Sequence, residues 1–119
     1  MRKFMFSFRG GGIVVQPPPP PAEIGAHLAK WTEWVGGLVK AGHAEPAAGP
    51  LENGGKVVRG SGRAVTDGPY AEAKDLVSGI LIVSASSLAA AVELARGCPI
   101  YEYDGSVEVR PVQEMHPGR

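Results

Sequence analysis

The chain has 119 residues, 44% of them hydrophobic and 20% charged, which is the composition of one ordinary globular domain. Twelve basic and twelve acidic side chains cancel, so direct binding to nucleic acid or to an anionic membrane surface is not expected. No apolar run approaches the roughly 18 residues of a membrane span, and the single cysteine, Cys98, cannot form an internal disulfide. We therefore expect a cytoplasmic protein.

The first part of the chain predicts a strand and then a helix. The segment KFMFSF, residues 3–8, alternates with the period of a strand, and its two apolar faces favour a central place in a sheet. The five prolines of 17–21 are interpreted as a stiff spacer that opens a helix, rather than as a ligand for a proline-recognition domain. The helix is predicted over about 22–41 from one apolar stripe. That stripe consists of Ile24, Leu28, Trp31, Val35 and Leu38.

The second part predicts a hairpin, a strand, a helix and a last strand. Residues 56–66 are typical of two short strands about a Gly-Ser-Gly turn, and 78–85 of a buried strand. A helix over 87–97 begins at Ser87, a good N-cap residue, and the segment 98–105 is interpreted as a loop. A strand at 106–112 ends a domain of 1–112, which leaves a loose tail at 113–119.

This order predicts an α+β fold of the ferredoxin-like type, a βαββαβ antiparallel sheet with an extra hairpin in the middle connection. In that fold the helices lie on one face of the sheet. The chain offers nothing to cover the other face, so we expect a homodimer that packs sheet against sheet.

The stretch VTDGPYAEAKD, residues 65–75, has no clear helical or strand period. Asp67, Gly68 and Pro69 are good turn residues, and Gly68 is expected to adopt a positive φ there. A turn alone does not explain the polar and aromatic side chains that follow it, beginning with Tyr70.

This motif, with KFMFSFRGG before it and SVEVRP after it, resembles the YCII-related family, in the branch named for its Asp-Gly-Pro-Phe motif. Tyr70 replaces the phenylalanine of that motif. The resemblance implies a ferredoxin-like subunit that dimerises as an α/β barrel, and a histidine and an aspartate suspected of catalysis. Relatives of this branch occur fused to sigma-type transcription factors.

By motif the histidine matches His27, and the aspartate that we pair with it is Asp67. From its position on the shoulder of the helical stripe, His27 is equally open to a purely structural interpretation. A carboxylate that accepts from one imidazole nitrogen fixes the tautomer and leaves the other nitrogen free as a base. The residues expected to contact a ligand are Tyr70, Arg63, Lys74 and Trp31.

Other chemistry has weaker support in the sequence. The three histidines and Cys98 lack metal-ligand spacing, so neither a metal nor another cofactor is expected. Cys98 is interpreted as a small buried hydrophobe rather than a nucleophile.

Two functions remain open. One is an enzyme that acts on a small polar or aromatic metabolite by acid–base chemistry, such as a lyase, isomerase or dehalogenase-like reaction. The other is a non-catalytic regulatory or accessory module that contacts a protein such as a sigma factor.

Overall fold

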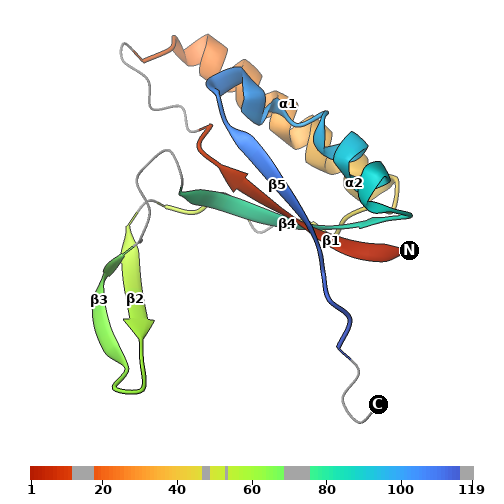
Figure 1. The fold of residues 1–119 in the computed structure, drawn as a ribbon. Helices are drawn as coiled ribbons and strands as arrows, with labels where there is room; N and C mark the ends of the chain where they lie inside the picture. The colour runs from red at the N-terminus through yellow and green to blue at the C-terminus, as the bar shows by residue number, and fades with distance from the viewer. Residues whose placement is uncertain (12–17, 47–48, 53, 69–75, 116–119) are drawn as a thin grey trace.

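The structure is a computed structural model of the chain, and it describes residues 1–11, 18–46, 49–52, 54–68 and 76–115. It has an α+β architecture with antiparallel sheets, compatible with the predicted ferredoxin-like fold (Figure 1). In chain order the elements are β1 (Arg2–Arg9), α1 (Pro21–Lys40), β2 (Gly55–Arg59), β3 (Ala64–Gly68), β4 (Val77–Ala85), α2 (Leu88–Ala95), the 3-10 helix η2 (Pro99–Tyr103) and β5 (Ser106–Pro111).

Strand β1 is the middle strand of the main sheet. Among the described residues this sheet has the order β4-β1-β5, with Phe6 opposite Leu81 on β4 and Val109 on β5. The side chains of Phe4, Phe6 and Phe8 are all buried in the core on the helical face. The central position predicted from the apolar alternation of residues 3–8 is therefore confirmed.

Helix α2 packs on the sheet through small side chains. Ala91 and Ala95 are buried, and because they are small the helix can lie close to β4 and β5. The backbone N–H of Ala90 donates to the hydroxyl oxygen of Ser87 at 3.1 Å, so the predicted N-cap is confirmed.

Helix α1 packs on the same face through its two tryptophans. The ring of Trp34 stacks on Phe6 with centroids 6.3 Å apart, and Trp31 meets the edge of Phe8 at 5.1 Å. The predicted apolar stripe is only partly buried, because Leu28 is 53% exposed. The aromatic cluster thus fixes α1 on the sheet while part of its apolar face lines a cavity.

His43, Ala44 and Leu51 bond to β4 along the edge that does not face β1. The N–H of Ser84 donates to the His43 carbonyl at 2.6 Å, and the N–H of Leu51 donates to the Ser78 carbonyl at 2.8 Å. Between these two anchors the chain contains prolines, which have no N–H to donate. Residues 47 and 48, between these two anchors, lie outside the described residues.

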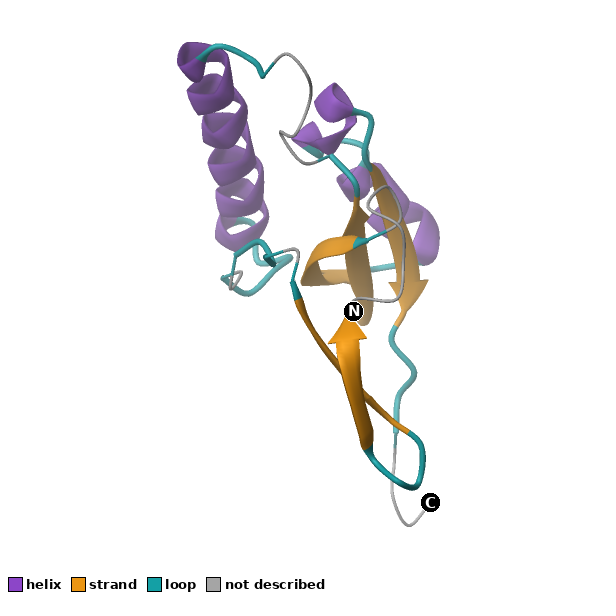
Figure 2. Ribbon diagram, turned by 90° about the vertical axis from the view of Figure 1, so that its left-hand side faces the viewer, coloured by secondary structure: helices purple, strands orange, loops and turns teal. Residues whose placement is uncertain are grey.

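Strands β2 and β3 form a separate antiparallel hairpin that extends away from the main sheet (Figures 1 and 2). Its cross-strand pair Val58 and Val65 is 64% and 62% exposed. The positive φ expected at Gly68 is wrong: Asp67 and Gly68 are the last residues of β3, and Gly68 does not have a positive φ. Its backbone is extended because Gly68 still pairs with Gly55 across the hairpin. Pro69, the third residue of the predicted corner, lies outside the described residues.

The C-terminal strand continues its pairing just beyond β5, since the N–H of Val112 donates to the carbonyl of Lys3 at 2.9 Å. Residues 113–115 are exposed and have no regular structure, and the rest of the predicted tail lies outside the described residues. The boundary between the domain and its tail at residue 112 stays a prediction.

Candidate functional site

The candidate site is built around His27, in the second turn of α1. Its imidazole is 3% exposed. The Nδ1 atom lies 2.7 Å from Oε1 of Glu102, and the indole N–H of Trp31 donates to Nε2 at 3.0 Å. The ring of Tyr103 meets the imidazole edge to face, with centroids 4.6 Å apart. Both nitrogens of this buried ring thus have partners.

These partners define the tautomer of His27. The indole nitrogen of Trp31 can only donate, so Nε2 of His27 must accept and carries no proton. In the neutral ring the proton is then on Nδ1, which donates it to the carboxylate of Glu102. An imidazole arranged in this way has its basic lone pair on Nε2.

Glu102 is kept anionic by a second partner. The ammonium of Lys30 donates to Oε2 of Glu102 at 2.6 Å. This hydrogen bond, followed by the one from His27, lowers the pKa of Glu102 below its ordinary value, while the same bond to Glu102 raises the pKa of Lys30. The carboxylate therefore accepts from the ring of His27 while its charge is balanced by Lys30.

The neighbouring tyrosine connects the same two elements. The hydroxyl of Tyr103 donates to Oε1 of Glu23 at 3.2 Å. Burial and, after it, the negative charge of Glu23 raise the pKa of Tyr103, so this phenol stays protonated at neutral pH. Glu23, His27 and Lys30 lie three or four residues apart, so they share the face of α1 that contacts η2.

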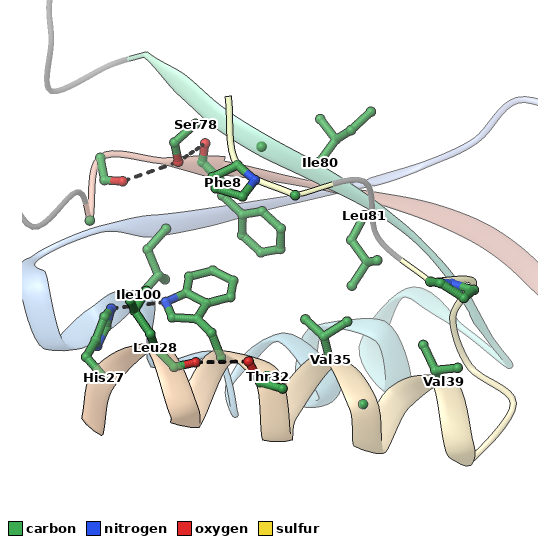
Figure 3. Close-up of a pocket in the computed structure, with 18 of the residues that line it drawn as sticks. Phe8, His27, Leu28, Thr32, Val35, Val39, Ser78, Ile80, Leu81 and Ile100 are labelled. Carbon is green, nitrogen blue, oxygen red and sulfur yellow. Dashed lines mark hydrogen bonds between the residues drawn. The ribbon is translucent and has the colours of Figure 1, made fainter. Parts of the chain in front are cut away.

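A cavity of about 800 Å³ adjoins the imidazole, between α1 and the edge of the main sheet (Figure 3). This volume is within the range of small-molecule sites. Most of the lining is apolar, and His27 is a lining residue at the N-terminal side of α1. The principal apolar side chains are Phe8, Leu28, Trp31, Val35, Val39 and Ile100.

The residues predicted for the site are not all brought together. Trp31 lines the cavity and contacts His27. Asp67 and Arg63 lie on the β2–β3 hairpin, Asp67 in an ion pair with Lys56 and Arg63 exposed in the turn with a φ of 55°. Tyr70 and Lys74 lie outside the described residues.

The carboxylate beside His27 is therefore Glu102 and not the predicted Asp67, which makes no contact with His27 within this chain. The cause is the β3 pairing, which places Asp67 on the hairpin opposite Lys56. The segment interpreted as a loop at 98–105 contains η2, and this helix carries both Glu102 and Tyr103 to α1. The sequence signal for η2 was Pro99, which suits the first turn of a helix.

Cys98 lies just before η2 and is buried, as predicted. Burial raises the pKa of its thiol to about 12, so the thiol is protonated at neutral pH. Among the described residues no three histidine, cysteine or acidic side chains are grouped closely enough to hold a metal ion. Within the same residues no helix has the length and apolar character needed to cross a membrane.

Fold and site together define a small α+β protein with a buried, carboxylate-bound imidazole beside an apolar cavity. The family model of the YCII-related domain matches residues 19–116. The chain therefore belongs to the YCII-related family. A comparison with curated proteins found no match.

Proposed function

We propose that the cavity binds a small molecule with an apolar or aromatic body and that His27 transfers a proton to or from it. The observation that carries this proposal is the fixed tautomer of His27, whose Nδ1–H donates to Glu102 at 2.7 Å. A structural histidine needs no adjoining cavity of about 800 Å³. A general base does need space for the molecule whose proton it takes, and a carboxylate that accepts from its other nitrogen orients it.

The chemistry follows from the hydrogen bonds. When Nε2 of His27 takes a proton from the ligand, the resulting imidazolium faces the anionic Glu102, which stabilises its positive charge. The indole N–H of Trp31 donates to Nε2 in the ligand-free protein, so an acidic group of the ligand replaces Trp31 as the donor. A positioned base of this kind contributes about 10²–10⁴-fold to a rate. Elimination, isomerisation and dehalogenation are reactions that such a proton transfer can begin.

The test uses nitrobenzisoxazole, an aromatic probe that reports on a base in an apolar cavity. When a base removes its ring C–H proton, the N–O bond breaks, the base keeps the proton and a coloured cyanonitrophenolate forms. We expect the wild type to accelerate this reaction and His27→Ala to lower the acceleration by about 10²-fold. His43→Gln is the matched control, because His43 bonds to the carbonyl of Ser84 and does not line the cavity.

Two further variants separate the candidate carboxylates. Glu102→Ala is expected to lower the rate and Asp67→Asn to leave it close to the wild type. A lower rate in Asp67→Asn with an unchanged rate in Glu102→Ala would instead indicate that Asp67 of a second copy of the chain is the carboxylate that contacts His27. Equal rates in the wild type and His27→Ala would contradict proton transfer and favour the non-catalytic module, with a sigma factor or another protein as its partner.

We also propose that the chain belongs to the Asp-Gly-Pro-Phe branch of the family, which the motif at Asp67, Gly68 and Pro69 supports. A homodimer that closes an α/β barrel is the proposed assembly. Its support is the apolar exposure of Ile80 and Ile82 on the sheet face opposite the helices. A cytoplasmic location is proposed from the single, buried cysteine.

A further inference from the structure

The cavity beside His27 extends along most of the length of α1. The residues of α1 that line it occur in pairs at every turn, from His27 and Leu28 at one end to Val39 and Lys40 at the other. Figure 3 shows the same order, with His27 and Val39 at opposite ends of the cavity and Val35 between them. From His27 to Val39 an α-helix rises by about 18 Å.

The cavity is therefore long and narrow. A volume of about 800 Å³ over about 18 Å corresponds to a mean cross-section of about 45 Å², so the cavity is more than twice as long as it is wide. A compact ligand would fill only one part of this space. An unbranched chain that lies parallel to α1 would contact the lining at every turn of the helix.

The two hydroxyl groups of the described lining are engaged within the protein. Thr32 donates to the carbonyl of Leu28 and Ser78 to the carbonyl of Phe8, each at 3.2 Å. A hydroxyl group has one proton, so neither side chain offers a further donor to a ligand. The wall between the two ends of the cavity therefore favours methylene groups over polar ones.

The two ends of the cavity differ in their chemistry. At one end the imidazole of His27 is 3% exposed and presents Nε2 as an acceptor. At the other end Lys40 is exposed, so this end of the cavity meets solvent. The polar end of a chain then lies at His27, and its tail extends toward Lys40.

We propose that the ligand of this cavity is an unbranched aliphatic chain with one polar end, which donates a hydrogen bond to Nε2 of His27. This inference rests on the proposed function, since it names the class of molecule on which His27 acts. The three backbone bonds of an extended residue span about 3.3–3.6 Å, so each bond advances a chain by about 1.2 Å. A chain of about 15 bonds therefore reaches from His27 to Val39.

The experiment titrates the protein with linear alcohols of 6, 10 and 14 carbon atoms and follows His27, Val35 and Val39 by NMR. Val35 lies about 12 Å from His27 along the helix and Val39 about 18 Å. We expect every alcohol to shift the ring signals of His27, decanol to shift the methyl signals of Val35 as well, and tetradecanol alone to shift those of Val39. From hexanol to decanol the affinity is expected to rise by about fourfold for each methylene group.

Two variants shorten the cavity by different amounts. Val39→Trp is expected to weaken the binding of tetradecanol by at least about tenfold, the effect of two or more displaced methylene groups, and to leave decanol unaffected. Val35→Trp should weaken decanol as well and leave hexanol unaffected. Val92→Trp is the matched control, because Val92 is a partly exposed valine of α2 that does not line the cavity. Thermal unfolding checks that each variant folds.

The wild-type titration decides the proposal even if a variant fails to fold. An affinity that does not rise with chain length, a compact alcohol such as adamantanol that binds as tightly as decanol, or hexanol signals at Val39 with none at His27 would each overturn it. A nitrobenzisoxazole rate that still requires His27 would then leave the proposed function standing, because that compact probe occupies only the end of the cavity beside His27. Conversely, chain binding as expected without a rate that depends on His27 would refute proton transfer alone.

Discussion

Glu102 on η2 accepts the Nδ1 proton of His27 on α1 at 2.7 Å, although the two residues are 75 positions apart in the chain. This contact gives the buried imidazole a defined tautomer. It also connects the site to Lys30, which binds the other oxygen of the same carboxylate. Glu102 is thus the residue whose replacement best separates a positioned base from a buried structural histidine.

Glu102→Gln and Glu102→Ala are expected to differ. The amide oxygen of glutamine can still accept from Nδ1–H of His27, so the tautomer survives without the negative charge. Alanine removes the acceptor and lets the ring turn. In the nitrobenzisoxazole assay we expect alanine to lower the rate by about 10- to 100-fold, the cost of a misplaced catalytic group, and glutamine to lower it less. Equal rates in both variants and the wild type would exclude a positioning role for Glu102.

The ion pair of Glu102 with Lys30 makes stability depend on pH. Because the folded-state pKa of Glu102 is lowered, its contribution is present above the ordinary glutamate value of about 4.3 and is lost as pH falls through the lowered value. The pKa of Lys30 is raised, so its contribution is present below about 10.4 and is lost as pH rises through the raised value.

Calorimetry of the wild type and Glu102→Gln across pH tests this dependence. The difference in Tm is expected to be constant near neutral pH and to shrink below about pH 4. Lys30→Met removes the same ion pair, so its Tm difference from the wild type should also shrink below about pH 4. A Tm difference that persists unchanged in acid would mean that the mutation acts on packing alone.

Cys98 is expected to be inert in the folded protein. Its thiol is buried and has a pKa of about 12, so almost no thiolate is present at pH values near 8. An aromatic disulfide reagent should label the native chain very slowly and the urea-unfolded chain at the rate of a free cysteine. Native labelling as fast as unfolded labelling would contradict the burial of Cys98.

The proposed homodimer predicts that a charge on the open sheet face breaks it. Ile82 on this face and Val92 on α2 are each 37% exposed, so they form a matched pair. By light scattering, Ile82→Lys is expected to convert a dimer into a monomer, because a lysine would be desolvated in the interface, while Val92→Lys remains dimeric. A monomeric wild type, or a dimer unaffected by Ile82→Lys, would refute a sheet-to-sheet interface.

Local patterns predicted much of the fold. The alternation of residues 3–8, the N-cap at Ser87 and the turn residues of the β2–β3 hairpin each lie within a few positions of one another, and the structure confirms them. Leu28 shows the limit of such patterns. Its helical spacing predicted burial, but Leu28 is 53% exposed and lines the cavity between α1 and the edge of the sheet.

The site was harder to predict than these local elements, because its residues meet only through tertiary packing. The position of His27 on the shoulder of the helical stripe was visible in the sequence, and its burial agrees with that position. Its partner was not visible, because a short 3-10 helix has no strong periodicity and Glu102 reaches α1 only through the tertiary packing of η2. Asp67 was predicted as the partner of His27 instead, because it belongs to the Asp-Gly-Pro motif.

The tautomer of His27 is the most direct test of the site. Nitrogen NMR of the imidazole ring, in the wild type near pH 8 with His27→Ala for assignment, distinguishes a protonated Nδ1 from a protonated Nε2. We predict a protonated Nδ1 and an unprotonated Nε2, and in Glu102→Ala a mixture of tautomers. A wild-type ring with its proton on Nε2, or one whose tautomer is indifferent to Glu102, would contradict the assignment of His27 as a base oriented by Glu102.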